Sequence, residues 1–235
     1  MKAVILAGGL GTRLKPFTET IPKPMLPVGE KSVLEVQIER LKQYGCDEII
    51  LATNYKSEYI EKYFKGDSIH GLRISISKEK KRLGTVGPLS LLKNKLTEPF
   101  IVMNGDVLSL IDFRKFYDFA LMNNAILTLA IKKEVTPFAF GNIFFKDDFV
   151  TGIEEKPDFI TYILAGIYVM SPKVFNHIPY NEFYDMDKLI KKFLKEKIPI
   201  SKYEMHEYWL DIGRPGDYEK AKEVYHEKFE NNKDK

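Results

Sequence analysis

The residues with the clearest chemical potential lie near the start of the chain, in the stretch LAGGLGTRLKPFTETIPKPM (6–25). Its first half carries Gly8, Gly9 and Gly11 directly behind a short apolar run. Because glycine has no side chain, backbone N–H groups in such a loop can approach an anion closely. The P-loop pattern G-x-x-x-x-G-K-[ST] is absent, and the dinucleotide fingerprint G-x-G-x-x-G fails because Leu14 stands at its third glycine position. The loop therefore predicts an anion site of another kind.

Positive charge follows these glycines at Arg13 and Lys23. A triphosphate carries more charge than a single pyrophosphate, and its transition state spreads charge over the attacked phosphorus and the leaving oxygens. Arginine and lysine clamps are the expected response. Prolines on both sides of Lys23 restrict its backbone and so pre-organise its charge. The alternative interpretation is purely structural. The glycines would form a tight strand-to-helix turn, IPKPM (21–25) would form a rigid surface turn, and the basic residues of both would only face solvent.

Two acids far apart in the sequence each end an apolar, strand-like run. Asp106 closes PFIVMNGD, and Asp211 lies in YWLDIGRP. If the two carboxylates converge, they make a Mg²⁺ site whose remaining positions are filled by water and phosphate oxygens. An isolated aspartate at a strand end is otherwise a turn or cap residue. The sequence alone leaves both interpretations open.

The stretch GIEEKP (152–157) places a carboxylate next to an ammonium group at Glu155 and Lys156. A carboxylate suits sugar hydroxyls, and an ammonium suits the phosphate of a sugar phosphate. Adjacent residues of a regular strand face opposite ways, so a bend at Pro157 would have to re-aim one of them. The alternative is the solvated edge of a hairpin.

The composition limits the remaining functions. The formal net charge of +3 is too mild to indicate a nucleic-acid partner, and no apolar run is long enough to span a bilayer. The four histidines show no metal-ligand spacing, and no G-x-S-x-G elbow is present. We interpret Cys46, the single cysteine, as a small residue behind the first helix rather than a nucleophile. With no N-terminal signal pattern, the expected setting is the cytoplasm.

The elements that must position these groups alternate between strand and helix. Short apolar runs predict strands, and the apolar spacing that begins at Ser32, with Glu35 completing a capping box and Gly45 ending it, predicts a helix. This alternation predicts an α/β layer with a mainly parallel sheet, whose ligands lie at the carboxyl ends of the strands. The predicted strands span 2–7, 47–53, 72–77 and 99–106, and the predicted helices span 32–45 and 55–64.

The alternation of predicted strands and helices ends after residue 123. AILTLAIKK, FGNIFF, VTGIEEK and LAGIYVM follow in near succession, and we interpret them as strands that extend the sheet around a second sub-site. Two amphipathic helices are predicted at 185–197 and 215–229, with Pro215 at the first helical position of the second.

Four motifs in this order resemble the sugar-1-phosphate nucleotidylyltransferases: LAGGLGTRLKPFTETIPKPMLPVG, MNGD, GIEEKP and YWLDIGRPGDY. The resemblance covers roughly residues 2–222. It implies a three-layer α/β/α sandwich built on a Rossmann-like mixed sheet of the nucleotide-diphospho-sugar transferase type. It also implies one domain over 1–235, with a nucleotide-binding part at about 1–110 and a sugar-phosphate-binding part at about 111–222.

The resemblance further implies roles for individual residues. Arg13 and Lys23 would hold the triphosphate and activate the attacked phosphorus, and Asp106 and Asp211 would bind Mg²⁺. The nucleotide would be bound by Leu6, Ala7, Gly8, Gly9, Gly11, Thr12, Gly84 and Asn104. The sugar phosphate would be bound by Gly141, Glu155, Lys156 and Gly166.

The implied reaction joins an NTP and a sugar 1-phosphate. A sugar-phosphate oxygen attacks the α-phosphorus in line, and pyrophosphate leaves, so neither a covalent intermediate nor a general base is needed. IPKPMLPVG and LGTVGPL look more like mannose- and heptose-1-phosphate guanylyltransferases than thymidylyltransferases, which usually have Ser-Lys-Gln in place of Pro-Lys-Pro, and this favours GTP.

Several alternatives stay open. They are uridylyl, thymidylyl or cytidylyl transfer, and a catalytically silent subunit that binds nucleotide sugars. Intact Arg13, Lys23, Asp106 and Asp211 disfavour the silent subunit. No nucleic acid or membrane partner is expected, and a homo-oligomer is possible because relatives often form dimers or tetramers.

Overall fold

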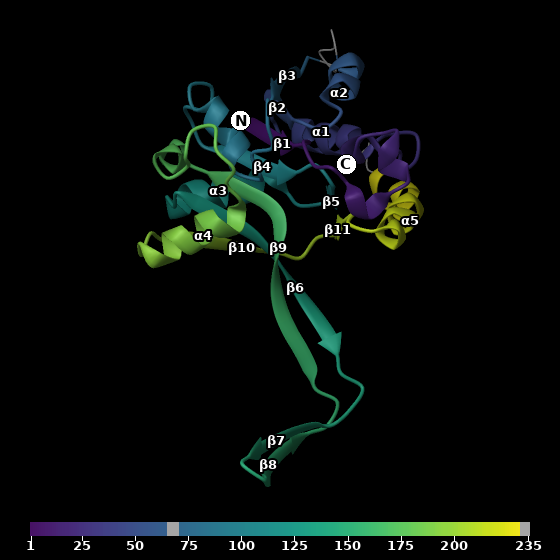
Figure 1. Ribbon diagram of the computed structural model, residues 1–235, viewed down its shortest axis with the longest axis vertical. Coiled ribbons are helices and arrows are strands. Elements are labelled where there is room, and N and C mark those ends of the chain that lie inside the picture. The colour runs from purple at the N-terminus through teal and green to yellow at the C-terminus, as the bar shows by residue number, and fades with distance from the viewer. Residues whose placement is uncertain (65–70, 231–235) are drawn as a thin grey trace.

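The computed structural model describes residues 1–64 and 71–230 and is organised around one mixed sheet (Figure 1). This sheet has seven strands in the order β10-β6-β9-β4-β1-β2-β3. All neighbours pair in parallel except β9, which is antiparallel to both β4 and β6. The predicted mainly parallel sheet is therefore confirmed. Its strands are β1 (Lys2–Leu6), β2 (Glu48–Thr53), β3 (Arg73–Lys78), β4 (Phe100–Asn104), β6 (Leu127–Pro137), β9 (Asp158–Met170) and β10 (Ile200–Met205).

Helices cover both faces of the sheet and make three layers. Successive side chains of a strand point to opposite faces. On β1, Ala3 and Ile5 are buried against α1, α2 and α3, while Val4 is buried with α4 on the other face. The helices are α1 (Val33–Gln43), α2 (Ser57–Tyr63), α3 (Phe113–Asn123), α4 (Met186–Lys195) and α5 (Pro215–Val224). No helix in the described ranges has the length and apolar character needed to cross a bilayer.

The ends of α1 follow the predicted chemistry. The Ser32 hydroxyl accepts a hydrogen bond from the Glu35 backbone at 3.2 Å, and the Glu35 carboxylate accepts one from the Ser32 backbone at 2.8 Å. Gly45, just past the helix, has a φ of +86°, which glycine adopts at little cost. The capping box and the glycine stop are both confirmed.

Cys46 is buried behind this helix, and burial raises the pKa of its thiol to about 12, so it is no nucleophile at neutral pH.

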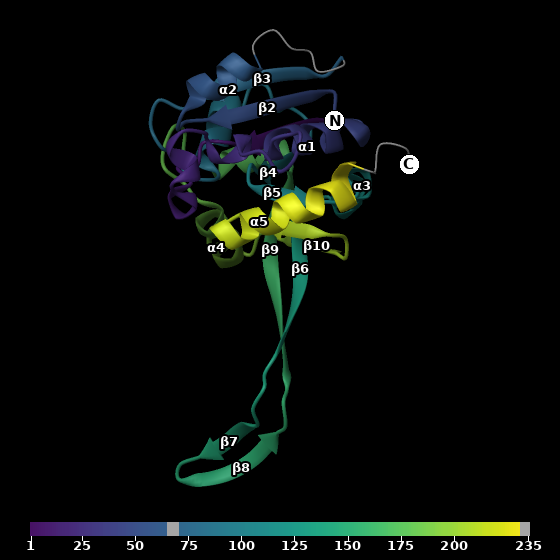
Figure 2. The same ribbon diagram turned by 90° about the vertical axis from the view of Figure 1, so that its right-hand side faces the viewer.

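In the second half of the chain the structure confirms two of the four predicted sheet strands, which lie in β6 and β9, and contradicts the other two. The strands β7 (Asn142–Lys146) and β8 (Phe149–Glu154) do not extend the central sheet; they pair only with each other among the described strands. The outer parts of β6 and β9 leave the body as a two-stranded ribbon that carries this hairpin at its far end (Figures 1 and 2). We call residues 132–164 the arm. The helix α3 and the strand β10 were not predicted, although Phe113, Phe116 and Ala120 of α3 are buried at helical spacing.

Replacing Ser32 by alanine removes the side-chain acceptor that caps α1. We expect the free energy of unfolding to fall by about 1 kcal/mol. Urea denaturation followed by circular dichroism measures this, and Ser32→Thr, which keeps the hydroxyl, serves as the control. Equal stability of Ser32→Ala and the unmodified protein would contradict the capping role.

Candidate active site

A cavity of about 180 Å³ opens at the carboxyl ends of β1, β2 and β4. The glycine loop forms one wall, and Gly8 leaves little room there. A Cβ on Gly8 would lie 3.0 Å from Glu79 Oε1 and 3.1 Å from Asn54 Cβ. A side chain at this position would therefore have to push Glu79 or Asn54 aside. Its lining residues are Leu6, Gly8, Gly9, Ala52, Glu79, Arg82, Gly84, Thr85, Pro88, Asn104, Asp106 and Asp185.

Glu79 is a cavity residue that the sequence analysis missed. It is buried, and burial raises the pKa of its carboxyl to about 7. Its Oε2 accepts a hydrogen bond from the Leu83 backbone at 3.0 Å, while Oε1 lies toward Gly8. A carboxyl group in such a place is available for a hydrogen-bonding ligand. The only sequence signal is an acid two residues past the apolar alternation of β3.

Gly84 lies where a side chain cannot fit. Its φ is +81°, and a Cβ there would lie 2.8 Å from the Tyr184 carbonyl oxygen. The neighbouring Thr85 backbone donates to Asp185 Oδ1 at 3.0 Å, and the Thr85 hydroxyl accepts from the Met186 backbone at 2.8 Å. These bonds fix the loop before the turn Gly87–Leu92 to the start of α4 and place Gly84 at the cavity wall.

The two predicted metal ligands lie side by side. Asp106 directly precedes β5 (Val107–Ser109), and Asp211 ends β11 (Trp209–Asp211). These two short strands pair antiparallel with Asp211 opposite Val107, and the Ile212 backbone donates to the Asp106 carbonyl oxygen at 2.9 Å. Trp209 anchors β11 by donating its indole N–H to the Ala165 carbonyl oxygen at 2.7 Å.

The predicted cations meet the same acids. Lys23 is buried and forms an ion pair with Asp106. Arg13 extends to the other acid: a Cβ on Gly213 would lie 3.2 Å from Asp211 Oδ2 and 3.6 Å from Arg13 Nη1. The exposed guanidinium of Arg13 and the Asp211 carboxylate therefore flank one small residue.

The electrostatics of this cluster match a site for a cation and an anion together. Burial and the nearby charge of Asp106 raise the pKa of Asp211, against the opposing influence of Lys23 and Arg13. A divalent cation would relieve the repulsion between the carboxylates, and Mg²⁺ typically takes one or two carboxylates plus phosphate oxygens and water. The donor set therefore fits Mg²⁺. Residues 1–64 and 71–230 hold no group of three or more His, Cys, Asp or Glu side chains able to bind a metal.

Gln37 holds the turn that carries Asp106. From α1, its buried amide donates to the Asn104 carbonyl oxygen at 2.9 Å and to the Val107 carbonyl oxygen at 2.6 Å. Gly105 lies between them and packs closely on β1, because a Cβ there would lie 2.7 Å from the Leu6 carbonyl oxygen. In the sequence, Gln37 is a lone polar residue on the apolar face of α1. No other feature of the sequence indicates that it has a structural role.

The remaining predicted nucleotide residues differ in their exposure. Ala7 is fully buried, and its backbone donates to the Ala52 carbonyl oxygen at 2.7 Å. Gly11 has a φ of +62° and begins the short turn that contains the exposed Thr12. Asn104 faces Gly166, where a Cβ would lie 2.7 Å from the Asn104 amide nitrogen.

The predicted sugar-phosphate residues are divided by the structure. Gly166 lies in the body beside Asn104, whereas Gly141, Glu155 and Lys156 lie in the outer part of the arm. Gly141 is close to Glu155, since a Cβ there would lie 3.2 Å from Glu155 Oε2. Lys156 has a φ of +47°, so the backbone does bend between β8 and β9. Within one copy, the outer part of the arm projects away from the body that holds β5 and β11 (Figure 1).

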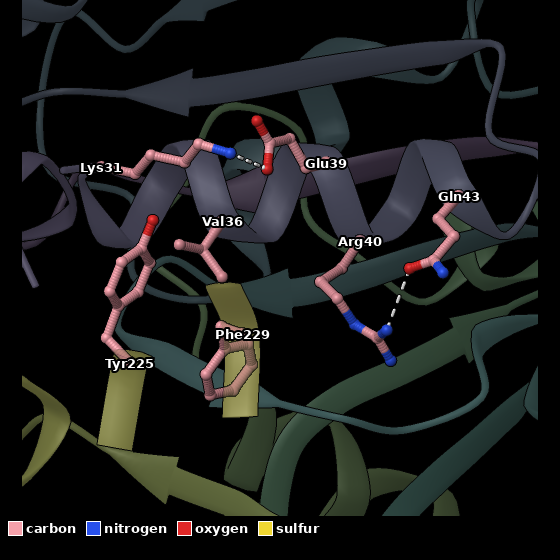
Figure 3. A pocket seen from close by; sticks show the side chains of 7 residues that line it. All are labelled: Lys31, Val36, Glu39, Arg40, Gln43, Tyr225 and Phe229. Atoms are coloured by element: carbon pink, nitrogen blue, oxygen red, sulfur yellow. Dashed lines mark hydrogen bonds and ion pairs between the residues drawn. The ribbon is translucent and has the colours of Figure 1, made fainter. Parts of the chain in front are cut away.

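A second cavity, of about 210 Å³, lies between α1 and the C-terminal turn Tyr225–Glu230 (Figure 3). Its charged groups already have partners: Lys31 pairs with Glu39 at 2.5 Å, and Arg40 donates to Gln43 at 3.0 Å. Tyr225 and Phe229 supply its apolar side. No set of unpaired polar groups converges there among the described residues, so the cavity beside Asp106 is the better candidate.

The sequence model of the Nucleotidyl transferase family matches residues 2–228. The chain belongs to the sugar-1-phosphate nucleotidylyltransferase family. A D-glycero-alpha-D-manno-heptose 1-phosphate guanylyltransferase of Aneurinibacillus thermoaerophilus is 37% identical over 231 residues, which cover 96% of this chain and 99% of that protein. The probable mannose-1-phosphate guanylyltransferase 1 of Oryza sativa subsp. japonica is 35% identical over 227 residues, 93% of this chain, but this chain spans only 63% of its length.

Among solved structures, HddC from Yersinia pseudotuberculosis complexed with GMP-PN is similar, with a TM-score of 0.74 and 31% identity. The match covers 95% of this chain and 99% of that one. The resemblance that the motifs indicated is thus confirmed at the level of the family, and so is the nucleotide-diphospho-sugar transferase type of fold.

Gln37→Leu removes the donor that holds the Asn104–Val107 turn and leaves buried carbonyl oxygens without it. We expect a loss of about 1–3 kcal/mol in the free energy of unfolding. Denaturant titration measures this, with Gln43→Leu at the exposed end of the same helix as the control. If both variants are equally stable, the buried amide does not hold the turn.

Proposed function

We propose that the chain is a guanylyltransferase that joins GTP and a sugar 1-phosphate. A phosphate oxygen of the sugar attacks the α-phosphorus, the bond from that phosphorus to the bridging oxygen breaks, and pyrophosphate leaves with the electron pair. The convergence of Arg13 and Lys23 with two carboxylates at one edge of the cavity carries this proposal. It offers positive charge where a triphosphate would accumulate negative charge.

The cationic residues would bind the phosphates, and the acidic residues would bind the metal. Arg13 and Lys23 would hold triphosphate oxygens and stabilise the charge that develops at the α-phosphorus. Asp106 and Asp211 would hold Mg²⁺, which when bound would neutralise charge on the phosphates. The attacking group is already an anion, so its position matters more than any proton transfer. The nucleotide would lie along residues of the 1–110 part, with Leu6, Ala7, Gly8, Gly9, Gly11, Thr12, Gly84 and Asn104 around it.

Glu79 supports guanine as the base. Guanine presents an N1–H and an amino group on one edge, and both donate to a carboxylate. Uracil and thymine present one N–H between two carbonyl oxygens, which a carboxylate would repel. Because Glu79 Oε1 lies at the cavity wall, it would accept from guanine. The names of the curated relatives, guanylyltransferases for mannose or manno-heptose 1-phosphate, point to the same base and to sugars of that type.

Gly166 would lie near the sugar phosphate, and Gly141, Glu155 and Lys156 would bind it from the 111–222 part. A cytoplasmic setting suits a chain with a single, buried thiol. A silent binding subunit is disfavoured because Arg13, Lys23, Asp106 and Asp211 are all present and adjacent.

Pyrophosphate release from GTP, UTP, dTTP and CTP with mannose, manno-heptose and glucose 1-phosphates tests the proposal. Release with GTP and a manno-configured sugar supports it, and no release with any pair contradicts it.

Arg13→Ala removes the guanidinium beside Asp211. We expect kcat/KM to fall by about 10²–10³, because one donor to the transition state is lost. Steady-state pyrophosphate release measures this. Lys15→Ala is the matched control, since Lys15 is a nearby exposed cation that pairs with Glu19 at 3.6 Å. Wild-type turnover by Arg13→Ala would show that this arginine does not clamp the triphosphate.

Glu79 gives the reaction a pH dependence of defined sign. Its pKa of about 7 means that the carboxylate, the form that accepts from guanine, is lost as the pH falls through 7. We expect KM for GTP to rise between pH 8 and pH 6. In Glu79→Gln, which does not titrate, the profile is expected to be flat and kcat/KM for GTP about 10–100-fold lower. An unchanged GTP preference in this variant would remove Glu79 from base recognition.

A further inference from the structure

The arm is unusually apolar for a surface that one copy of the chain leaves uncovered. The exposed fractions of its aromatic side chains include 71% for Phe140, 74% for Phe145 and 77% for Phe149. The exposed large hydrophobic residues of the arm are Val135, Phe138, Phe140, Ile143, Phe144, Phe145, Phe149, Val150, Ile153, Phe159, Ile160, Tyr162 and Leu164.

The exposed apolar area has the size of a protein interface. With about 150–250 Å² per aromatic side chain, these residues together expose on the order of 1,000 Å². A typical monomer shows patches of about 300–600 Å², whereas a standard interface buries about 800 Å² per partner. A two-stranded hairpin such as β7–β8 is also at best marginally stable alone in water, so it needs a surface to pack on.

The arm cannot meet this need by folding back on its own body. Its two strands form a continuous ladder from the pair Lys132 and Ile163 to the pair Pro137 and Asp158. The Phe138 backbone then donates to the Pro157 carbonyl oxygen at 3.0 Å. Because the same strands continue into the central sheet, bending the arm back would break these bonds. The six residue steps from Leu164 to Asp158 carry it about 20 Å outward, which is enough to reach a neighbouring molecule.

One group of charged residues in the arm, Glu154, Glu155 and Lys156, lies where the arm bends. Glu155 and Lys156 are both exposed at the bend between β8 and β9, beside Pro157, which is buried. The cavity in the body, in turn, has few cations of its own. Arg13 and Lys23 lie beside the two aspartates, and Arg82 is the one cation among the described residues that line the cavity.

We propose that two copies of the chain exchange arms, so that Glu155 and Lys156 of the partner subunit complete the cleft formed by Arg13, Asp106 and Asp211. This inference rests on the proposed function, because it assigns the sugar phosphate to these two residues. A second copy is the favoured occupant because only it carries both halves of one site. Reciprocal exchange is self-complementary, so the assembly closes as a dimer and covers both arms.

Complementation between two inactive variants tests the exchange. Arg13→Ala with one affinity tag and Lys156→Ala with another are co-expressed, and the mixed dimer is purified through both tags. Each variant alone is expected to lose about tenfold or more in pyrophosphate release from GTP and mannose 1-phosphate. In the mixed dimer one composite site carries both substitutions and the other carries neither, so we expect about half the wild-type activity. A mixed dimer as inactive as its parents, or a wild-type protein that sediments as a monomer, overturns the proposal.

A readout that needs no activity separates this inference from the proposed function. A photoreactive benzoylphenylalanine replaces Phe145 in one tagged copy, and the other copy carries none. After irradiation, a covalent dimer that bears both tags is expected. The same group in place of Met122, which is 85% exposed on α3, is the control and should give no such product. Absence of the crosslink from position 145 contradicts arm exchange even if the enzyme is active, and its presence supports exchange even if every substrate pair is silent.

Discussion

The antiparallel pairing of β5 with β11 is the contact on which the site depends. It joins two segments about a hundred residues apart and places Asp211 opposite Val107, next to Asp106. Neither strand is long, so other contacts must fix the pair. Gln37 does so from α1 and Trp209 from β11, each through hydrogen bonds to backbone carbonyl groups. Without this register, the two carboxylates would belong to unrelated turns.

The charges around this pair balance one another before any ligand binds. Lys23 neutralises Asp106, and Arg13 lies beside Asp211 across Gly213. A nucleotide with its metal would replace these internal contacts by equivalent ones, with cations moving to phosphate and carboxylates to Mg²⁺. Glu79, which also lines this cavity, is the one buried acid among the described residues, and burial raises the pKa of its carboxyl to about 7.

Local patterns in the sequence predicted what depends on local chemistry. The apolar runs, the Ser32 capping box and the glycine loop each follow from neighbouring residues, and the structure confirms the elements that they indicate. The meeting of Asp106 with Asp211 was a hypothesis that only the three-dimensional register could resolve. Gln37 and Glu79 escaped notice because a buried polar residue looks like any other polar residue until its surroundings are known. The arm was misassigned for a different reason: the alternation in FGNIFF and VTGIEEK predicts strands, but alternation does not say which sheet a strand joins.

The central claim is that one cavity at the ends of β1 and β4 binds the nucleotide and its metal. Crystals grown with Mn²⁺ and a non-hydrolysable GTP analogue test it directly, since Mn²⁺ scatters anomalously and takes the place of Mg²⁺. We predict an anomalous peak between the carboxylates of Asp106 and Asp211, with the triphosphate against Arg13 and the guanine beside Glu79. Mn²⁺ and nucleotide bound elsewhere, for instance between α1 and Tyr225, would contradict this account.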